Sequence, residues 1–427
     1  MKIMDNPRKT AVNILLKIEK EAAYSNITIA GFFKDAQLSR EDKALVSALV
    51  YGVLDRKITL DYVLSQFMKT PLKKTAPFTL QVLRTALYQI MFMEKIPDSA
   101  AVNEAVKLIK KSRENRNSGF VNAVLRSILR SEKLLPESDS AEDLSVRFSC
   151  PLWMVKSFIA DYGLDTAISL LEESLKPAPL TIRVNTVKID KESLKNELSD
   201  MGIACDDGQE ENSLLILKGM DIANSDLYKK GYFYVQDAAS QKAISALAPK
   251  SGERVLDMCA APGGKSFTMA MFMENEGEIV SCDLYEARVG LIEKSAQRLG
   301  LDIIKPTVCD ASVFDDKLGE FDCILCDVPC SGLGVIRRKP DIKYKPECDY
   351  GELEELQYKI LTNAVKYLKP GGRILYSTCT LRKAENEKLV IRFQKEYNGF
   401  CKMHECCLMP HIDKTDGFYF ALLKNEA

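Results

Sequence analysis

Long apolar runs are missing from this sequence of 427 residues. A helix that crosses a bilayer needs about 20 consecutive apolar residues, and no stretch of the chain approaches that length. Residues 1–10 are mainly polar and lack the apolar centre of a secretory signal peptide. We therefore expect a cytoplasmic protein that does not bind membranes. Its 13 cysteines should be free thiols, because disulfides are rare in the reducing cytosol.

Histidine is scarce, and the cysteine spacing of a zinc site is incomplete. The C-x-x-C pair of Cys323 and Cys326 lies in the apolar run FDCILCD, which is typical of a buried strand. No second pair follows at the spacing of a zinc finger. A further group of possible ligands lies near the C-terminus, at His404, Cys406, Cys407 and His411. We expect no metal site in this chain.

Charge is nearly balanced over the whole chain, with a net charge of −1, but it is uneven along it. Residues 1–130 contain 22 Lys and Arg against 12 Asp and Glu, so they carry +10 and the remainder carries −11. A basic segment joined to an acidic one predicts a polyanionic partner. The alternative is a basic domain that contacts the acidic part of the chain instead of a nucleic acid.

The length and the hydrophobic pattern predict several domains. Apolar residues at three- and four-residue spacing predict a helical bundle over residues 1–130. A polar, acidic stretch with a proline predicts a linker at 131–145. Short strand-like segments around one helix predict a small α+β segment at 146–235. Strands alternating with helices predict a doubly wound, mainly parallel α/β sheet at 236–427.

A turn of small residues follows the first strand of this predicted sheet. After VLDM the chain reads CAAPGGKS, and the backbone of such a turn can approach a ligand closely before a helix begins. The turn has neither the G-x-x-x-x-G-K-[ST] spacing of a phosphate-binding loop nor the G-x-G-x-x-G spacing of a dinucleotide loop. We expect it to bind another cofactor through Cys259, Ala260, Ala261, Pro262, Gly263, Gly264 and Lys265.

Aspartates end four of the predicted strands, at Asp257, Asp283, Asp310 and Asp327. Ligands bind at the carboxyl ends of the strands in such sheets, so we expect these side chains around one pocket. Asp283 suits a ribose diol, Asp310 suits an adenine amino group, and Asp327 suits a positively charged sulfonium. This pattern predicts S-adenosylmethionine. An NAD-dependent oxidoreductase is the alternative, which the missing dinucleotide spacing disfavours.

Two strand ends carry cysteines followed by hydroxyl residues, Cys330 in DVPCSGLG and Cys379 in STCT. In the usual strand order of a methyltransferase sheet these strands are neighbours, so the thiols should face each other. A thiolate that adds to carbon 6 of cytosine makes carbon 5 able to accept a methyl group. We expect Lys265 and the cofactor's charge to lower the pKa of the attacking thiol. The histidines lie outside these motifs, so no histidine base is expected.

These motifs, together with GYFYVQDAAS at 231–240, resemble those of the Nol–Nop–Sun family of RNA cytosine-5 methyltransferases. The segments NPRKTAVNILLKIE, PDSAAVNEAVKLIKK and GFVNAVLRSILR resemble the NusB-type RNA-binding domain that a bacterial member of that family carries. The resemblance spans essentially the whole chain. It implies a Rossmann-like class I methyltransferase domain, preceded by an all-α NusB-like domain and a small α+β segment.

The resemblance also implies roles for the two cysteines and a partner. It makes Cys379 the nucleophile and Cys330 the group that promotes product release. DNA cytosine methyltransferases place the nucleophile in a Pro-Cys motif like Pro329-Cys330, which is the alternative assignment. Val328 stands where the family often has alanine. The implied substrate is small-subunit ribosomal RNA, free or in an assembling subunit, and no DNA partner is expected. A non-catalytic RNA-binding relic is disfavoured by the intact motifs.

Overall fold

The computed structural model describes residues 6–21, 25–132, 134–217, 225–344 and 350–426. It divides the chain into two compact units. The first, which we call the helical unit, comprises Met1–Lys176 and Ile336–Glu347. The second, which we call the sheet unit, comprises Pro177–Val335 and Cys348–Ala427. Among the described residues, no helix is both long and apolar enough to cross a membrane.

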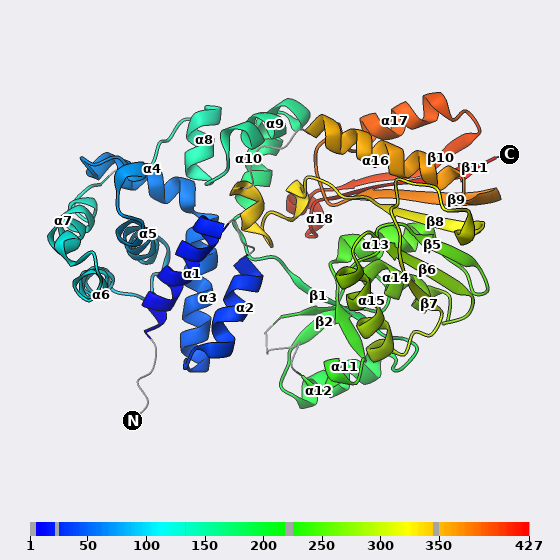
Figure 1. Ribbon diagram of the computed structural model, residues 1–427, viewed down its shortest axis with the longest axis horizontal. Helices are drawn as coiled ribbons and strands as arrows, with labels where there is room; N and C mark the ends of the chain where they lie inside the picture. The colour runs from blue at the N-terminus through cyan, green and yellow to red at the C-terminus, as the bar shows by residue number, and fades with distance from the viewer. Residues whose placement is uncertain (1–5, 22–24, 133, 218–224, 345–349, 427) are drawn as a thin grey trace. The chain divides into compact units, whose positions relative to one another are not determined.

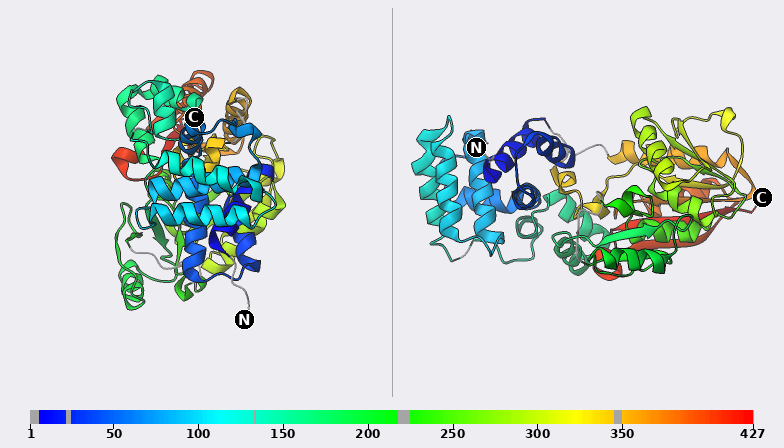
Figure 2. Two further views of the ribbon diagram at one scale, coloured as in Figure 1. Left: turned by 90° about the vertical axis from the view of Figure 1, so that its left-hand side faces the viewer. Right: turned by 90° about the horizontal axis from the view of Figure 1, so that it is seen from below.

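The described helices between Pro7 and Ile128 form a bundle around α5 (Figures 1 and 2). Helix α5 packs against α1, α3, α4, α6 and α7, so its polar side chains are buried as well as its apolar ones. Buried Arg84 of α5 pairs with Asp61 at 2.7 Å and with Glu19 at 3.1 Å. The helices are α1 (Pro7–Glu21), α2 (Ser25–Asp35), α3 (Arg40–Asp55), α4 (Lys57–Phe67), α5 (Pro77–Phe92), α6 (Asp98–Lys110) and α7 (Ser118–Ile128).

Three more helices follow in the part of the helical unit that ends at Lys176: α8 (Ala141–Arg147), α9 (Leu152–Tyr162) and α10 (Leu164–Glu173). Their positions differ from the sequence expectation, since α8 begins inside the stretch interpreted as a linker. Ser140 caps α8 by accepting a hydrogen bond from the backbone N–H of Asp143, so the acidic residues form its first turn. The structure also places α9 and α10 ahead of the first strand, where only strands and one helix were expected.

A segment from the second half of the chain completes the helical unit. Residues Pro340–Tyr344 form a short 3₁₀ helix, and the side chain of Lys343 is fully buried. Its Nζ lies 2.7 Å from Oδ1 of Asp55 on α3. Arg337 also pairs with Glu173 of α10 at 3.4 Å, with both side chains buried. The segment that begins at Ile336 therefore packs as part of the helical unit, although the residues before and after it in the sequence belong to the sheet unit.

The sheet unit begins with a small antiparallel sheet in the order β2-β3-β1-β4. Helix α11 (Lys191–Asp200) packs on it through Leu194 and Leu198. The other elements are β1 (Leu180–Val184), β2 (Cys205–Asp207), β3 (Ser213–Ile216), β4 (Phe233–Val235) and α12 (Asp226–Lys229).

The main sheet has seven strands in the order β10-β11-β9-β8-β5-β6-β7. The strands from β9 to β7 run parallel, and β11 and β10 are antiparallel. This confirms the expected doubly wound, mainly parallel sheet. The strands are β5 (Arg254–Asp257), β6 (Glu278–Asp283), β7 (Ile304–Val308), β8 (Phe321–Asp327), β9 (Leu368–Thr378), β10 (Phe400–Leu408) and β11 (Phe418–Asn425).

Helices cover both faces of the main sheet (Figure 1). One apolar core joins the strands to α13 (Ala238–Leu247), α14 (Gly264–Phe272) and α15 (Glu286–Leu299). The other joins them to α16 (Tyr350–Val365) and α17 (Glu387–Glu396). A short helix, α18 (Pro410–Asp413), connects β10 to β11. Because β5 lies at the centre of the sheet, the turn that follows it is placed at the point where the strand order reverses.

Candidate active site

The turn between β5 and α14 contains the residues expected to bind a cofactor, from Cys259 to Lys265. Gly263 has φ +105°, and a Cβ there would lie 2.3 Å from the ring of Phe267, so no other residue fits this position. The backbone N–H of Ala260 donates to the carbonyl of Cys282 on β6 at 2.7 Å. Gln236 donates to the carbonyl of Gly264 at 3.0 Å, which explains the position of the GYFYVQDAAS block beside this turn.

Asp257 and Asp327 lie at the ends of neighbouring strands and differ in their partners. Asp257 is almost fully buried, and one of its oxygens accepts a hydrogen bond from Ser266 at 2.6 Å. The other oxygen, Oδ1, has no hydrogen-bond partner within the described residues. Burial raises the pKa of Asp257 to about 7, and the charge of Asp327 acts in the same direction. Asp327 itself accepts from Lys265 at 2.7 Å and from Ser377 at 2.8 Å.

The remaining two aspartates lie further along the same edge of the sheet. Asp283 is buried at the end of β6, where it pairs with Arg288 at 3.2 Å. Arg288 also donates to the carbonyl of Ala261, which connects Asp283 to the turn after β5. Asp310 follows β7 and is exposed, with its carboxylate accepting from the backbone and hydroxyl of Ser312. The structure thus groups Asp257, Asp327 and Lys265, and places Asp283 and Asp310 progressively farther along the edge.

Lys265 connects the cofactor turn to the cysteine motifs. Its Nζ pairs with Asp327 and lies 5.1 Å from the centre of the Phe418 ring. Burial lowers the pKa of Lys265, but the charge and hydrogen bond of Asp327 outweigh this effect and raise it above its ordinary value. A negative charge on Cys379 would raise it further. Lys265 therefore stays positively charged beside the thiols.

The two cysteines lie side by side because β8 and β9 are parallel neighbours, with Asp327 opposite Ser377. The sulfur atoms of Cys330 and Cys379 are 3.0 Å apart. The pKa of Cys330 is raised well above its ordinary value, first by its hydrogen bond with Cys379 and then by burial. The raised pKa favours the protonated thiol of Cys330 beside the sulfur of Cys379.

A network of polar side chains supports these cysteines and was missed by the sequence analysis. Glu385, in the loop after β9, is fully buried and accepts hydrogen bonds from Ser331, Gln357 and Arg382. Ser331 is also hydrogen-bonded to Thr380 at 2.7 Å, so the residues that follow the two cysteines are joined. These hydrogen bonds join segments that are distant in the sequence, so a local pattern does not predict them. The sequence feature that could have pointed to this network is the glutamate six residues after Cys379.

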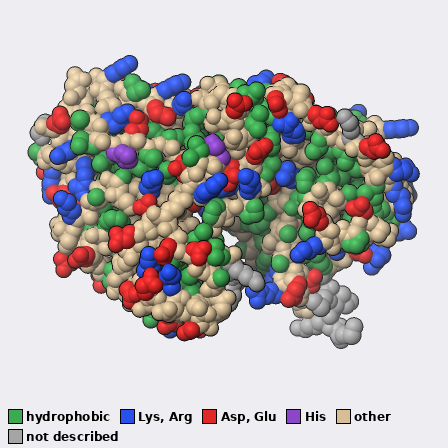
Figure 3. Space-filling view, turned by 180° about the vertical axis from the view of Figure 1, so that it is seen from behind, with side chains coloured by type: hydrophobic (Ala, Val, Ile, Leu, Met, Phe, Trp, Pro, Cys, Tyr) green, Lys and Arg blue, Asp and Glu red, His purple; other side chains and the backbone are tan. Residues whose placement is uncertain are grey.

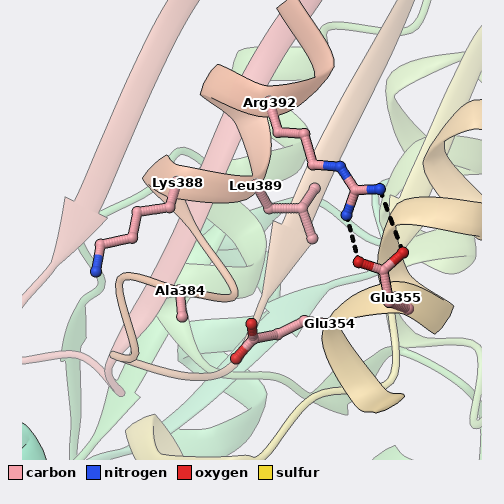
Figure 4. A pocket seen from close by; sticks show the side chains of 6 residues that line it. All are labelled: Glu354, Glu355, Ala384, Lys388, Leu389 and Arg392. Carbon is pink, nitrogen blue, oxygen red and sulfur yellow. Dashed lines mark hydrogen bonds and ion pairs between the residues drawn. The ribbon is translucent and has the colours of Figure 1, made fainter. Parts of the chain in front are cut away.

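A pocket of about 180 Å³ lies elsewhere in the sheet unit (Figure 4). It is lined by residues of α16, α17 and the loop before α17: Glu354, Glu355, Ala384, Lys388, Leu389 and Arg392. Glu355 and Arg392 pair with each other across it. None of the cofactor-turn residues and neither cysteine lines this pocket, so it is distinct from the site at the strand ends.

The histidines and cysteines near the C-terminus lie on β10 and α18 and form no metal-binding group among the described residues.

Comparisons with known proteins agree with this arrangement. Three family models match the chain: NusB over residues 5–130, a ferredoxin-like domain of RsmF/B-like methyltransferases over 150–223, and the 16S rRNA methyltransferase RsmB/F over 244–424. The crystal structure of PH0851 matches all of both chains with a TM-score of 0.83 at 25% identity. A methyltransferase homologue from Pyrococcus horikoshii matches 68% of this chain and 100% of its own, with a TM-score of 0.61 at 27% identity.

Relatives in bacteria match over nearly their full lengths. The probable ribosomal RNA small subunit methyltransferase B of Bacillus subtilis is 38% identical, with 98% of each chain covered. The corresponding enzyme of Vibrio cholerae is 33% identical, with 91% of each chain covered. Since this similarity extends through all three matched regions, the chain belongs to the ribosomal RNA small subunit methyltransferase B family.

Proposed function

We propose that this protein transfers a methyl group from S-adenosylmethionine to carbon 5 of a cytosine in 16S ribosomal RNA, through a covalent adduct of Cys379. The observation that carries this proposal is the 3.0 Å contact between the sulfur atoms of Cys379 and Cys330 at the ends of neighbouring strands, beside Lys265. A pair of inert structural cysteines would need neither the adjacent Lys265–Asp327 ion pair nor the buried support under the turn.

The residues around the cofactor turn fit S-adenosylmethionine. The unpartnered, buried Oδ1 of Asp257 is an acceptor without a donor in the described chain, and the glycines at 263 and 264 let a ligand approach the backbone. Asp283 would accept from the ribose hydroxyls and Asp310 from the adenine amino group. When bound, this cofactor supplies an electrophilic methyl group.

The chain's own residues would then act in sequence on the cytosine. The Cys379 thiolate adds to carbon 6, which forms a carbon–sulfur bond and places electron density on carbon 5. After carbon 5 has taken the methyl group, it gives up its proton to a base, which is water or a side chain of the site. The electron pair of that carbon–hydrogen bond restores the double bond between carbons 5 and 6 and expels the Cys379 sulfur as a thiolate. Lys265 stabilises the thiolate before attack and after release. Cys330 promotes release.

The RNA would be held partly by the helical unit. Exposed basic side chains gather on α6, on α7, in the loop between them and just after α7: Lys107, Lys110, Lys111, Arg113, Arg116, Arg126 and Arg130. Figure 3 shows Lys and Arg side chains on the surface of the helical unit. Glu114, which lies among them, is turned inward to accept from Thr79, so of the two glutamates in this region only Glu104 offsets the surface charge, by pairing with Lys107 at 2.7 Å. Such a surface suits phosphate groups.

The test combines methyl transfer with mapping of the product. Purified protein is incubated with 16S ribosomal RNA and S-adenosylmethionine, and the RNA is analysed by bisulfite sequencing. We expect one or a few cytosines to become resistant to bisulfite. Methyl incorporation without a resistant cytosine would show a different target atom, and no incorporation into either free RNA or small subunits would contradict the proposal.

A further inference from the structure

The buried carboxylate of Glu385 fixes the turn that carries Cys330 on both sides of the cysteine. Its Oε2 accepts from the backbone N–H of Ser331 at 2.9 Å, and its Oε1 accepts from the Ser331 hydroxyl at 2.5 Å. Gln357 of α16 donates both to Oε2 of Glu385 at 2.8 Å and to the carbonyl of Pro329 at 2.9 Å. Ser331, after Cys330, is therefore bonded directly to the carboxylate, and Pro329, before it, is connected to the carboxylate through Gln357.

The same carboxylate also relates the Cys330 turn to the Cys379 motif. The Ser331 hydroxyl contacts Oγ1 of Thr380, the residue after Cys379, at 2.7 Å. Glu385 lies in the segment that continues from Cys379, and its carbonyl accepts from Tyr376 of β9 at 2.7 Å. Glu385 is thus held in place by β9, the strand that leads to Cys379. Its carboxylate in turn holds the turn that carries Cys330.

Burying a charged carboxylate costs free energy, so we expect the charge of Glu385 to contribute something that a neutral side chain would not. Arg382 donates to it at 3.0 Å, and the three remaining hydrogen bonds come from neutral groups. A carboxylate accepts charge-assisted bonds, which are shorter and stronger than those of an amide. Its negative charge is also one of the influences that raise the pKa of Cys330, after the hydrogen bond with Cys379, burial and the charge of Cys379.

We propose that Glu385 is a positioning residue that holds the Cys330 thiol against the sulfur of Cys379. For the reaction this inference rests on the proposed function, because a displaced Cys330 would slow release of the methylated RNA. The placement of the two sulfur atoms can be tested without RNA or cofactor.

The first test measures how fast the two thiols combine in the full-length protein. Diamide takes two hydrogen atoms from a pair of adjacent thiols, becomes the hydrazine, and leaves a disulfide. The rate of Cys330–Cys379 disulfide formation, followed by mass spectrometry of peptides, reports how closely the thiols are held. We expect the rate to fall about tenfold or more in Glu385→Ala, since charge-assisted bonds to Ser331 are lost. Ser331→Ala should lower the rate less.

Glu355→Ala is the matched control, because Glu355 is a nearby glutamate of α16 that pairs with Arg392 and makes no contact with the Cys330 turn (Figure 4). Its disulfide rate should equal that of the unaltered protein. An unchanged rate in a folded Glu385→Ala protein would overturn the inference. If that variant does not fold, an unchanged rate in Ser331→Ala, which loses one hydroxyl, would overturn it instead.

The second test uses the covalent complex with RNA. We expect Cys330→Ala to accumulate the covalent protein–RNA complex, because release stalls. Glu385→Ala should accumulate the same complex to a smaller extent, whereas Cys379→Ala should form none. A phenotype like that of Cys379→Ala would overturn the positioning of Cys330. If no variant forms an adduct at all, the proposed function fails, whereas the disulfide rates still decide the role of Glu385.

Discussion

At the scale of single residues, the proposed function gives the two adjacent thiols different roles, with attack by Cys379 and product release by Cys330. Replacing each one should therefore have a different effect. Cys379→Ala should abolish both methyl transfer and the covalent RNA complex, since no thiolate remains to add to carbon 6. Cys330→Ala should leave attack and methylation possible but stall release, so a protein–RNA complex should accumulate and survive denaturing electrophoresis.

The unaltered protein and a Cys323→Ala variant serve as controls, because Cys323 is buried in the interior of β8. Loss of the complex in Cys330→Ala together with its retention in Cys379→Ala would reverse the two roles, as in the Pro-Cys arrangement of DNA cytosine methyltransferases. The methyltransferase activity itself would remain supported by that result.

Asp257 should make the stability of the protein depend on pH. Burial raises its pKa from an ordinary value of 3.8 to about 7, so the fold favours the protonated carboxyl. The stabilisation is complete below about pH 4 and is lost as the pH rises through 7. Over that range the unaltered protein should lose up to about 4 kcal/mol relative to Asp257→Asn, which cannot ionise. Urea unfolding of both proteins at several pH values measures the difference, and parallel pH profiles would contradict it.

The sequence could predict the residues of the site that lie in short motifs, but not those that reach the site from elsewhere. The cofactor turn, Asp327 and the two cysteines each follow a strand, and parallel strands end at one edge. Glu385 and Gln357 follow no strand end and act through contacts with residues 28 to 54 positions away. Spacing along the chain carries no information about such contacts.

At the scale of elements, α6 and α7 provide a basic surface whose contribution can be separated from that of the site. Each phosphate contact that is lost should reduce the slope of log affinity against log salt concentration by about 0.7–0.9. Lys110→Ala combined with Arg116→Ala should therefore weaken RNA binding and flatten its salt dependence by about 1.5. Filter binding or fluorescence anisotropy between low and moderate salt measures both quantities.

The control is a double variant on α1, Lys17→Ala with Lys20→Ala, which also removes two exposed positive charges from the helical unit. It should change the salt slope less than the variant on α6 and α7. Equal effects of the two double variants would mean that net charge, and not this surface, attracts the RNA.

Elements differed in how well their sequence patterns predicted them. Most strands of the main sheet are apolar runs followed by a polar residue, and their pattern predicted them. Strand β10 was not expected, because FCKMHECCL mixes polar and apolar residues and most of its side chains are only partly buried. It is specified by pairing with β11, a contact between strands that a local pattern does not encode. Helices α8 to α10 are short, and the acidic cap of α8 has the composition of a linker.

At the scale of the whole molecule, the ion pair between Lys343 and Asp55 joins the late segment to the helical unit. Lys343→Ala would leave Asp55 without its partner in a largely buried position. We expect the helical unit to lose about 3–5 kcal/mol of stability, as is usual when one member of a buried pair is removed. Urea unfolding followed by a probe in the helical unit would measure this loss.

Two further variants define the origin of the effect. Lys339→Ala removes an exposed lysine of the same segment and should change stability by less than about 0.5 kcal/mol. A second variant, Lys343→Met combined with Asp55→Leu, replaces the pair by apolar side chains and should recover much of the loss. If Lys343→Ala unfolds like Lys339→Ala, the buried pair does not anchor the segment.

The late position of this segment has a consequence for synthesis on the ribosome. The helices up to Lys176 emerge first, but the piece that completes their unit begins at Ile336, about 160 residues later. At roughly 5–20 residues per second, the nascent helices wait on the order of 10–30 s with Asp55 unpaired. By then the cofactor turn and Cys330 have already been translated. We therefore expect a chain arrested before residue 336 to be degraded by proteases in its helical part, so that a firmly folded helical unit arises only in molecules that also carry the Cys330 turn.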